Sequence, residues 1–376
     1  MRERFHLPAR VYLCGHSLGP LAHEVTDAII AELDTWRTLG VTGHFAGPRP
    51  WMRIQEGIRE PLARLAGARP DEVVAMNALT VNLHLMLATF FRGHGKIVID
   101  EPTFPSDRYA VTSHLVQRGL DPSEYLLTVS SLDELEQLLS KGGVELTLLA
   151  GVNWLTGEVL AIKHASDLCR RYGVVLGLDL AHAVGNVPLS LHEDGVDFAV
   201  WCSYKYLNAG PGAVAGCFVH QRHGNDLRLS RWAGWWGNDP ATRFRMHLER
   251  DFVPVAGAEG WQLSNPPILA LAPLRASLGM FDEVGMDSLR KQSIQLFEQL
   301  LSLLPSTVRL SSPRECQRRG NMVCLQISNP ERAQARFAAA GIVCDVRPPD
   351  TIRASFCPLY NTPEDVEAFA KVLCEE

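Results

Sequence analysis

The sequence lacks the short signatures that assign many proteins to a class. Its nine cysteines are scattered and never form a C-x-x-C pair, no run reaches the ~18 apolar residues of a membrane-spanning helix, and no G-x-x-x-x-G-K-[ST] loop occurs. The charged N-terminus, Met1 to His6, is not followed by the apolar run of a signal peptide. These absences favour a cytoplasmic protein with reduced thiols and no membrane segment.

An excess of basic residues is also missing. The chain has 36 Lys and Arg residues against 42 Asp and Glu residues, a formal net charge of −6, which argues against nucleic acid or an anionic membrane as a partner. Of its 376 residues, 46% are hydrophobic and 21% are charged. This is the composition of a globular protein, and the length suits one large and one small domain.

Short apolar runs alternate with longer amphipathic segments through the first part of the chain. Such strand–helix alternation predicts an α/β fold with a mainly parallel, doubly wound sheet. The runs expected to be buried strands are Lys96–Asp100, Glu145–Ala150, Val174–Leu180, Asp197–Trp201 and Ala213–Val219. The helices expected between them are Ser106–Gln117, Ser131–Ser140 and Lys163–Tyr172.

The pattern changes after about Pro266, where two long helical segments precede a strand–strand–helix–strand–strand–helix order. This order predicts a small C-terminal α/β domain. The expected helices are 267–281, 286–304, 331–340 and 363–374, and the expected strands are 307–311, 322–327, 342–346 and 352–356. A further helix at 21–36 has no strand partner nearby. We expect an N-terminal segment (1–45) packing with the small domain, a large domain (46–270) and the small domain (271–376).

Two motifs carry weaker signals. The segment Gly15–Gly19 matches the G-x-S-x-G elbow of serine hydrolases, but the stretch before Ser17 is too short for the sheet that such an elbow follows. A turn before a helix is the better interpretation. His220 and His223 form an H-x-x-H pair without a third ligand nearby, so a surface pair is favoured and we expect no metal site.

Two charged residues end adjacent predicted strands. Asp179 ends a strongly apolar strand, and Lys205 follows the next strand, among aromatic residues and before a Gly-rich loop. In a parallel sheet these strand ends share one edge, where ligands bind. A carboxylate that keeps a pyridine nitrogen protonated and an amine that forms an imine are what pyridoxal phosphate (PLP) requires. Taken alone, Asp179 has the simpler interpretation of a helix N-cap, and Lys205 that of a surface loop residue.

Two further residues suit the same cofactor. Thr80 precedes the apolar helix Val81–Phe91 and is a candidate N-cap that holds the phosphate, because helix N-termini attract anions. Phe104 follows the strand Lys96–Asp100 and is a candidate to stack on the pyridine ring. Simple helix capping and ordinary core packing are the alternative interpretations of these two residues.

Eight blocks of the sequence together resemble the kynureninase family. They are PRPW (48–51), NALTVNLHLM (77–86), TFPSDRYA (103–110), DLAHAVGNVPLSLHEDGVDFA (179–199), WCSYKYLNAGPGAVAG (201–216), GWWGN (234–238), SNPPIL (264–269) and IRASFCPLYNT (352–362). The resemblance implies the fold-type I PLP-dependent transferase fold, with a mainly parallel seven-stranded sheet plus a small C-terminal α/β domain. It also implies hydrolysis of the Cβ–Cγ bond of L-kynurenine or L-3-hydroxykynurenine to an anthranilate and L-alanine, by a homodimer with its active site at the subunit interface.

The resemblance also implies roles for individual residues. Lys205 would form the imine with PLP, Asp179 would contact the pyridine nitrogen, and Tyr204 would relay a proton. Arg353 would bind the substrate carboxylate, which its bidentate geometry suits. The other expected cofactor contacts are Leu79, Thr80, Phe104, Asp107, His182, Tyr204, Trp235 and Asn265, the last two resembling residues supplied across a dimer interface. The other expected substrate contacts are Ser17, His44, Asn238 and Asn265.

Three positions depart from the family pattern. Ala150 stands where relatives often carry a hydroxyl group that contacts the phosphate, His16 where asparagine is expected, and Asn238 where some relatives that favour the 3-hydroxylated substrate carry histidine. These departures leave the expected reaction unchanged and the preferred ring substituent open. The alternative is another fold-type I activity, an aminotransferase or a cysteine desulfurase, with Cys357 as the candidate cysteine.

Overall fold

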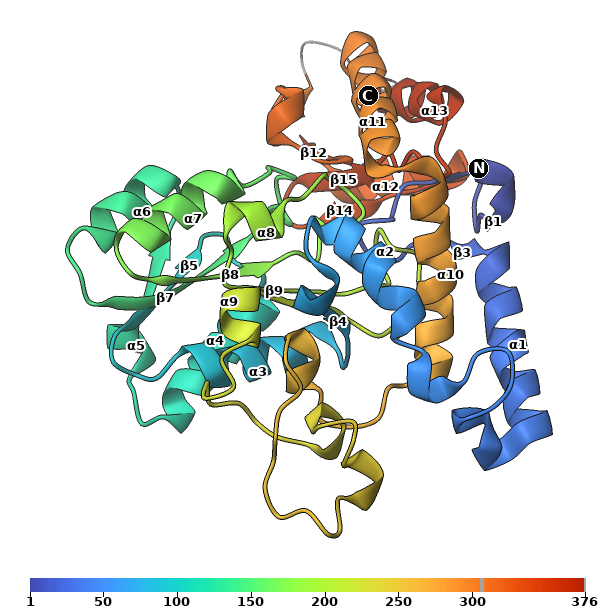
Figure 1. The fold of residues 1–376 in the computed structure, drawn as a ribbon. Helices are drawn as coiled ribbons and strands as arrows, with labels where there is room; N and C mark the ends of the chain where they lie inside the picture. Colours follow the sequence, from blue (N-terminus) through green and yellow to red (C-terminus); the bar gives the residue numbers. More distant parts are fainter. Residues whose placement is uncertain (305–307, 375–376) are drawn as a thin grey trace.

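A seven-stranded sheet forms the centre of the molecule in the computed structural model, which describes residues 1–304 and 308–374 (Figure 1). The strand order is β4-β10-β9-β8-β7-β5-β6, and β10 is antiparallel to both of its neighbours. The other neighbouring pairs are parallel, so the expected mainly parallel seven-stranded sheet is confirmed. The strands are β4 (Val73–Ala75), β5 (Lys96–Asp100), β6 (Leu126–Val129), β7 (Val144–Ala150), β8 (Val175–Asp179), β9 (Phe198–Trp201) and β10 (Gly216–Val219).

Side chains alternate between the two faces of this sheet, because successive residues of a strand point in opposite directions. Ile97 and Ile99 of β5 belong to one hydrophobic cluster and Val98 belongs to the other. Helices α3 and α4 contribute to the first cluster, and α6 and α7 to the second. The helices of this region are α2 (Glu56–Ala66), α3 (Leu79–Phe90), α4 (Pro105–Gln117), α5 (Pro122–Tyr125), α6 (Leu132–Leu139), α7 (Ile162–Arg171), α8 (Leu191–Asp194) and α9 (Gln221–Gly224).

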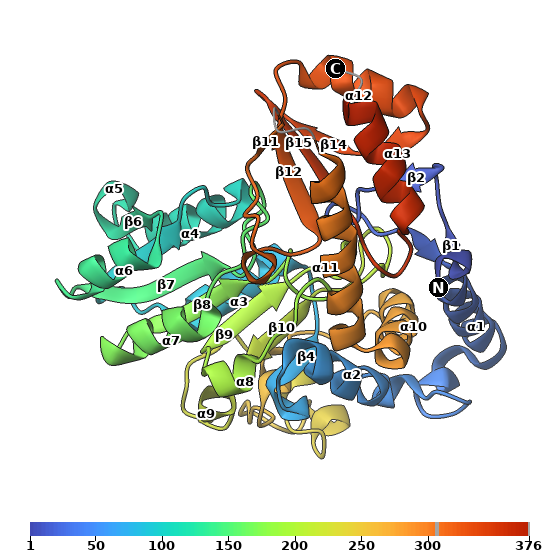
Figure 2. The ribbon, with the colours of Figure 1, turned by 90° about the horizontal axis from the view of Figure 1, so that it is seen from above.

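A second, four-stranded antiparallel sheet lies apart from the first (Figure 2). Its order is β11-β12-β15-β14, with β11 (Arg309–Leu310), β12 (Met322–Gln326), β15 (Thr351–Ser355) and β14 (Asp345–Arg347). Its hydrophobic cluster also takes residues from α11 (Met286–Leu303), α12 (Pro330–Ala339) and α13 (Pro363–Cys374). The single strand expected at 342–346 is wrong, because the chain changes partners at Cys344: β13 (Ile342–Val343) pairs with β2 (Val11–Tyr12), and only β14 joins this sheet. Thr307, at the start of the expected strand 307–311, lies outside the described residues.

The N-terminal segment packs against later parts of the chain. Strands β1 (Phe5–His6) and β3 (Leu21–Ala22) pair with each other, and α1 (His23–Leu39) lies along α10 (Ile268–Val284), as Figure 1 shows. The helix expected at 21–36 therefore starts two residues later and ends three residues later. The division into domains at 45/46 and 270/271 stays a prediction.

Short 3-10 helices complete the described elements, and no helix among them is long and apolar enough to cross a membrane. They are η1 (Arg2–Arg4), η2 (Gly40–His44), η3 (Trp51–Arg53), η4 (Pro70–Glu72), η5 (Trp235–Gly237), η6 (Arg243–Arg245), η7 (Ala258–Trp261) and η8 (Cys316–Arg318). Two of them, η2 and η5, carry or adjoin residues expected to contact substrate.

Candidate active site

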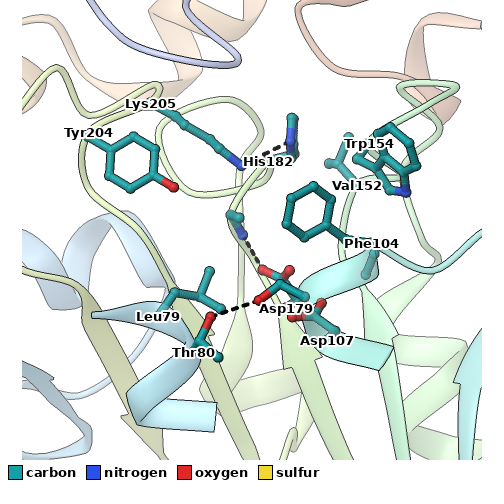
Figure 3. A pocket seen from close by; sticks show the side chains of 13 residues that line it. Leu79, Thr80, Phe104, Asp107, Val152, Trp154, Asp179, His182, Tyr204 and Lys205 are labelled. Atoms are coloured by element: carbon teal, nitrogen blue, oxygen red, sulfur yellow. Dashed lines mark hydrogen bonds between the residues drawn. The ribbon is translucent and has the colours of Figure 1, made fainter. Parts of the chain in front are cut away.

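A cavity opens at the edge of the sheet where β7 and β8 end, the edge at which parallel sheets bind ligands (Figure 3). About 600 Å³ between the lining residues is free of protein atoms, a volume that includes open solvent at the mouth of the cavity. The cavity brings together eight of the residues expected to contact the cofactor, and adds five others. The lining residues are Leu79, Thr80, Phe104, Ser106, Asp107, Ala150, Val152, Trp154, Asp179, Ala181, His182, Tyr204 and Lys205.

Lys205 lies in the loop after β9 and points into this cavity, where only 9% of the residue is exposed. The interpretation of Lys205 as a surface loop residue is therefore wrong. Its Nζ lies 3.1 Å from Nε2 of His182 and 5.6 Å from the centre of the Phe104 ring. Burial, with the Lys205 charge adding to it, holds the pKa of His182 well below its ordinary value. The His182 ring is therefore neutral near neutral pH and can accept a hydrogen bond from the Lys205 amine.

Three carboxyl groups lie near one another at this end of the sheet, Asp107 and Asp179 in the cavity lining and Asp100 at the end of β5. Asp179 ends β8, and its Oδ1 accepts a hydrogen bond from the Ala181 N–H at 2.7 Å; the segment that follows is a turn, so the helix N-cap interpretation is wrong. Asp107 is 4% exposed, and burial together with the Asp179 charge raises its pKa well above the ordinary value. Asp100, at the end of β5, has its pKa raised to about 6, mainly by burial. A cationic ligand group in this cavity would favour the ionised forms of these carboxyl groups.

Two helices begin at the cavity. Helix α3 starts at Leu79 with Ala78 as its N-cap, so Thr80 lies in the first turn and the N-cap expected at Thr80 is wrong. No side chain caps this described helix end, which leaves its first N–H groups available to an anion. The Thr80 hydroxyl lies 3.0 Å from the hydroxyl of Ser106, in the first turn of α4. Ser106 was not expected at the site, although it stands directly after Phe104 and Pro105, in one of the family-like blocks.

Aromatic rings close one side of the cavity. Phe104 immediately precedes α4 and is 41% exposed, so its interpretation as a core residue is wrong. Its ring meets the Trp154 ring edge to face at 5.7 Å, and the Trp154 indole N–H donates to the Pro102 carbonyl at 3.2 Å. No local sequence pattern predicts Trp154 or Val152 at the site, because both lie in the irregular segment after β7.

Arg353 lies on β15 of the second sheet, with its guanidinium carbon 5.8 Å from the centre of the Trp154 ring. It is buried, its Nη1 donates to the Trp154 carbonyl at 2.7 Å, and its Nε and Nη2 both donate to Oδ2 of Asp345. Ser17, in contrast, lies exposed in the turn before β3 and is not among the residues that line the described cavity. The neighbouring His16 bonds Ser355 and Asp345 instead, so the structure offers no support for the serine-hydrolase interpretation.

Four expected residues lie away from the cavity that contains Lys205. His44 meets the Trp51 ring edge to face at 5.1 Å, and Trp235 lies 6.3 Å from Phe244. Oδ1 of Asn238 accepts a hydrogen bond from the Val253 N–H at 2.7 Å, which joins the two ends of the loop 238–253. The fourth residue is Asn265, which is exposed before α10. Within the described parts of this single chain, none of the four lines the cavity.

Comparisons with known proteins identify relatives over almost the whole chain. A family model described as the kynureninase C-terminal domain matches residues 289–373. The kynureninase of Xanthomonas oryzae pv. oryzae (strain PXO99A) is 48% identical, over 98% of this chain and 93% of its own length. The kynureninase of Xanthomonas campestris pv. campestris (strain B100) is 47% identical, over 96% of this chain and 91% of its own.

Solved structures of other enzymes share the fold at low sequence identity. A C-DES mutant with glycine covalently linked to the PLP cofactor has a TM-score of 0.81 at 19% identity. The match covers 99% of this chain and 98% of the C-DES chain. The cysteine desulfurase CsdA from Escherichia coli has a TM-score of 0.81 at 16% identity, covering 100% of this chain and 96% of its own. These similarities confirm the expected fold-type I architecture.

Proposed function

The chain belongs to the kynureninase family, and on this basis we propose that it is a PLP-dependent hydrolase of L-kynurenine, L-3-hydroxykynurenine or both. It cleaves the Cβ–Cγ bond and releases an anthranilate and L-alanine. The observation that carries this proposal is the juxtaposition of Lys205 and Asp179 in one cavity with the uncapped start of α3. An amine, a carboxylate and an anion site are the three groups that PLP requires.

The cavity residues fit the cofactor chemically. Among the described residues, Oδ1 of Asp107 and Nδ1 of His182 are buried without a hydrogen-bond partner, which a polar ligand would supply. Lys205 would bind the cofactor's aldehyde carbon and Asp179 its pyridine nitrogen. The phosphate would be held by Thr80, Ser106 and the first N–H groups of α3, and Phe104 would lie against the ring. When bound, PLP supplies an electron sink for the substrate's α-carbon.

The chain's own groups provide the proton transfers. Nζ of Lys205 removes the proton from the substrate α-carbon, and the neutral His182 beside it orients the amine by accepting a hydrogen bond. Burial raises the pKa of Tyr204 above its ordinary value, so its phenol stays protonated near neutral pH and can donate a proton. Water then adds to the γ-carbonyl of the substrate with Tyr204 as the proton relay.

The carboxylate and the aromatic ring of the substrate are bound by residues that do not take part in the proton transfers. Arg353 receives the carboxylate, because its fork of N–H donors matches two carboxylate oxygens. We propose that the ring contacts His44 and Asn238 and that Trp235 and Asn265 reach the cavity of a second copy of the chain. Two aromatic residues near them, Phe45 and Phe244, are 63% and 55% exposed in the single chain, which supports a homodimer with its active site at the interface.

The alternative fold-type I activities differ in what they need. A cysteine desulfurase needs a reactive thiol, but Cys357 is buried and burial raises the pKa of its thiol to about 12. An aminotransferase needs a keto-acid acceptor. Release of fluorescent anthranilate from kynurenine without any keto acid therefore tests the proposal directly.

The matched variants are Lys205→Ala and Lys163→Ala. Lys163 is an exposed lysine of α7 paired with Asp167, so its loss should leave turnover unchanged. Loss of Lys205 should reduce turnover by about 10³-fold or more, since it removes both the cofactor's attachment and the base. Turnover that requires a keto acid would refute the proposal, and full activity of Lys205→Ala would refute the site. Comparison of kcat/KM for kynurenine, 3-hydroxykynurenine and a ring-methylated analogue then assigns the preferred ring substituent.

A further inference from the structure

Arg353 is one end of a buried chain of hydrogen bonds that joins three distant parts of the sequence. Oδ2 of Asp345 lies 3.1 Å from Nε of Arg353 and 3.3 Å from Nε2 of His16. Nδ1 of His16 lies 2.9 Å from the Ser355 hydroxyl, which lies 3.2 Å from the Tyr206 hydroxyl. We call these five residues the Arg353 network. Tyr206 follows Lys205 directly, so the network runs from the second sheet to the loop of the catalytic lysine.

The charge on Asp345 determines the direction of each hydrogen bond in this network. Bonds from His16 and Arg353 hold the pKa of Asp345 well below its ordinary value although burial opposes this, so the carboxylate is ionised and only accepts. Burial lowers the pKa of His16 to about 4, so its ring is neutral and Nε2 carries the single proton. Nδ1 must then accept from the Ser355 hydroxyl, and the Ser355 oxygen accepts from Tyr206. Each donor therefore has one acceptor, and the arrangement fixes the orientation of all five side chains.

This arrangement decides which N–H groups of Arg353 are left over. A guanidinium has five N–H donors in a fixed plane. Two of them, on Nε and Nη2, are directed at Asp345, and one on Nη1 is directed at the Trp154 carbonyl. By this count, one N–H on each of Nη1 and Nη2 has no partner among the described residues, and the guanidinium carbon lies 5.8 Å from the centre of the Trp154 ring, which lines the cavity. Two donors spaced in this way match the two oxygens of a carboxylate.

We propose that Asp345 and His16 are positioning residues for the substrate carboxylate: they hold Arg353 in the one orientation that presents its two free N–H groups. This inference rests on the proposed function, in which Arg353 receives the carboxylate. Without the Asp345 carboxylate the guanidinium can rotate about its side chain. Without Nε2 of His16, Asp345 loses its link to Ser355 and Tyr206. Neither residue touches the substrate, so both act through Arg353.

Binding of two amines to the holoenzyme tests this role, followed through the cofactor's absorbance. L-Alanine carries the carboxylate, and L-alaninol carries a hydroxymethyl group in its place. For Asp345→Asn and for His16→Ala, which removes Nε2, we expect Kd for alanine to rise ~10-fold or more, with Kd for alaninol within ~2-fold of wild type. Arg353→Gln should show the same selective loss. Arg347→Gln is the matched control, because Arg347 also donates to Asp345 but is 43% exposed, and it should change neither Kd.

A purely structural role predicts a different result. Damage to the fold would weaken the binding of both amines and would lower the thermal midpoint, so the thermal midpoint of each variant is also measured. Ser355→Ala removes one hydroxyl from the same network and serves as a second, smaller perturbation. Equal losses for alanine and alaninol, or no loss of alanine binding in Asp345→Asn and His16→Ala, would overturn the inference. If Arg353→Gln nevertheless showed a selective loss of alanine binding, the proposed function would still hold. Absence of any loss in Arg353→Gln would refute Arg353 as the carboxylate site and the inference with it.

Discussion

Asp100→Asn should stabilise the cofactor-free protein at neutral pH, which is an unusual result for removal of a buried charge. Asp100 ends β5, and its Oδ2 accepts from the Ala150 N–H at 3.3 Å. Burial, with the charge of Asp179 adding to it, raises its pKa from 3.8 to about 6. A carboxyl group with a raised folded-state pKa stabilises the fold below pH ~4, and that stability is lost as pH rises through 6, because the unfolded chain ionises more readily.

The size of the effect follows from this shift in pKa. About two pKa units at ~1.4 kcal/mol each correspond to a cost of about 3 kcal/mol for holding Asp100 ionised at pH 7.5. Asparagine retains an acceptor for the Ala150 N–H but forms a weaker hydrogen bond, which offsets about 1 kcal/mol of the stability gained by removing the charge. We therefore expect the variant to gain about 2 kcal/mol in the free energy of unfolding at pH 7.5, and much less at pH 4.5.

Urea unfolding of the cofactor-free protein at the two pH values measures this difference. Asp121→Asn is the matched control: Asp121 is exposed, and hydrogen bonds from Ser123 lower its pKa, so the variant should not gain stability as pH rises. In the double variant with Asp179→Asn, the gain from Asp100→Asn should shrink, since part of the raised pKa comes from Asp179. Equal destabilisation of Asp100→Asn at both pH values would refute the reasoning, because it would mean that hydrogen bonding outweighs charge at this position.

Three further variants test other parts of the site and fold. Ala150→Ser should tighten PLP binding ~10-fold in a fluorescence titration, because Ala150 lines the cavity and a hydroxyl at this position is expected to contact the phosphate; unchanged affinity would contradict this. Asn238→His should raise the ratio of kcat/KM for 3-hydroxykynurenine over kynurenine several-fold, and a constant ratio would exclude Asn238 from the ring pocket. Gly216→Ala should lower the thermal midpoint by several degrees, since a Cβ there would lie 2.1 Å from the Trp201 ring, whereas Gly279→Ala, with open space around it, should not.

The parts of the fold that follow from sequence are those whose signal is local. Buried parallel strands such as β5 and β8 appear as apolar runs, and the helices between them appear through their periodicity and their glycine ends. Strands β4 and β6 gave no such signal, since β4 has three residues and β6 is largely half-buried or exposed. Their place in the sheet is set by their partners β10 and β5.

The residues of the candidate site also divide into those that a local sequence pattern predicts and those that it does not. Lys205 and Asp179 could be found because each stands at a strand end, where the type of residue and its position coincide. Trp154 and Asp345 could not be found, because their importance lies in contacts with Phe104 and Arg353, which no local pattern specifies. The N-cap expected at Thr80 failed for a related reason: α3 starts after an alanine, so its first turn carries no polar capping signal.

The Arg353 network has a consequence for the order in which the enzyme becomes competent. His16 and Ser355 are separated by 339 positions, so one of its bonds joins the beginning of the chain to a strand near its end. Contacts of such long sequence separation form late, because chain closure must precede them. During synthesis the cofactor cavity can assemble first, from residues between Leu79 and Lys205, while carboxylate recognition waits for β15 to emerge and for the N-terminal turn to dock on it. Selection of amino acids among amines is therefore a property of the finished chain.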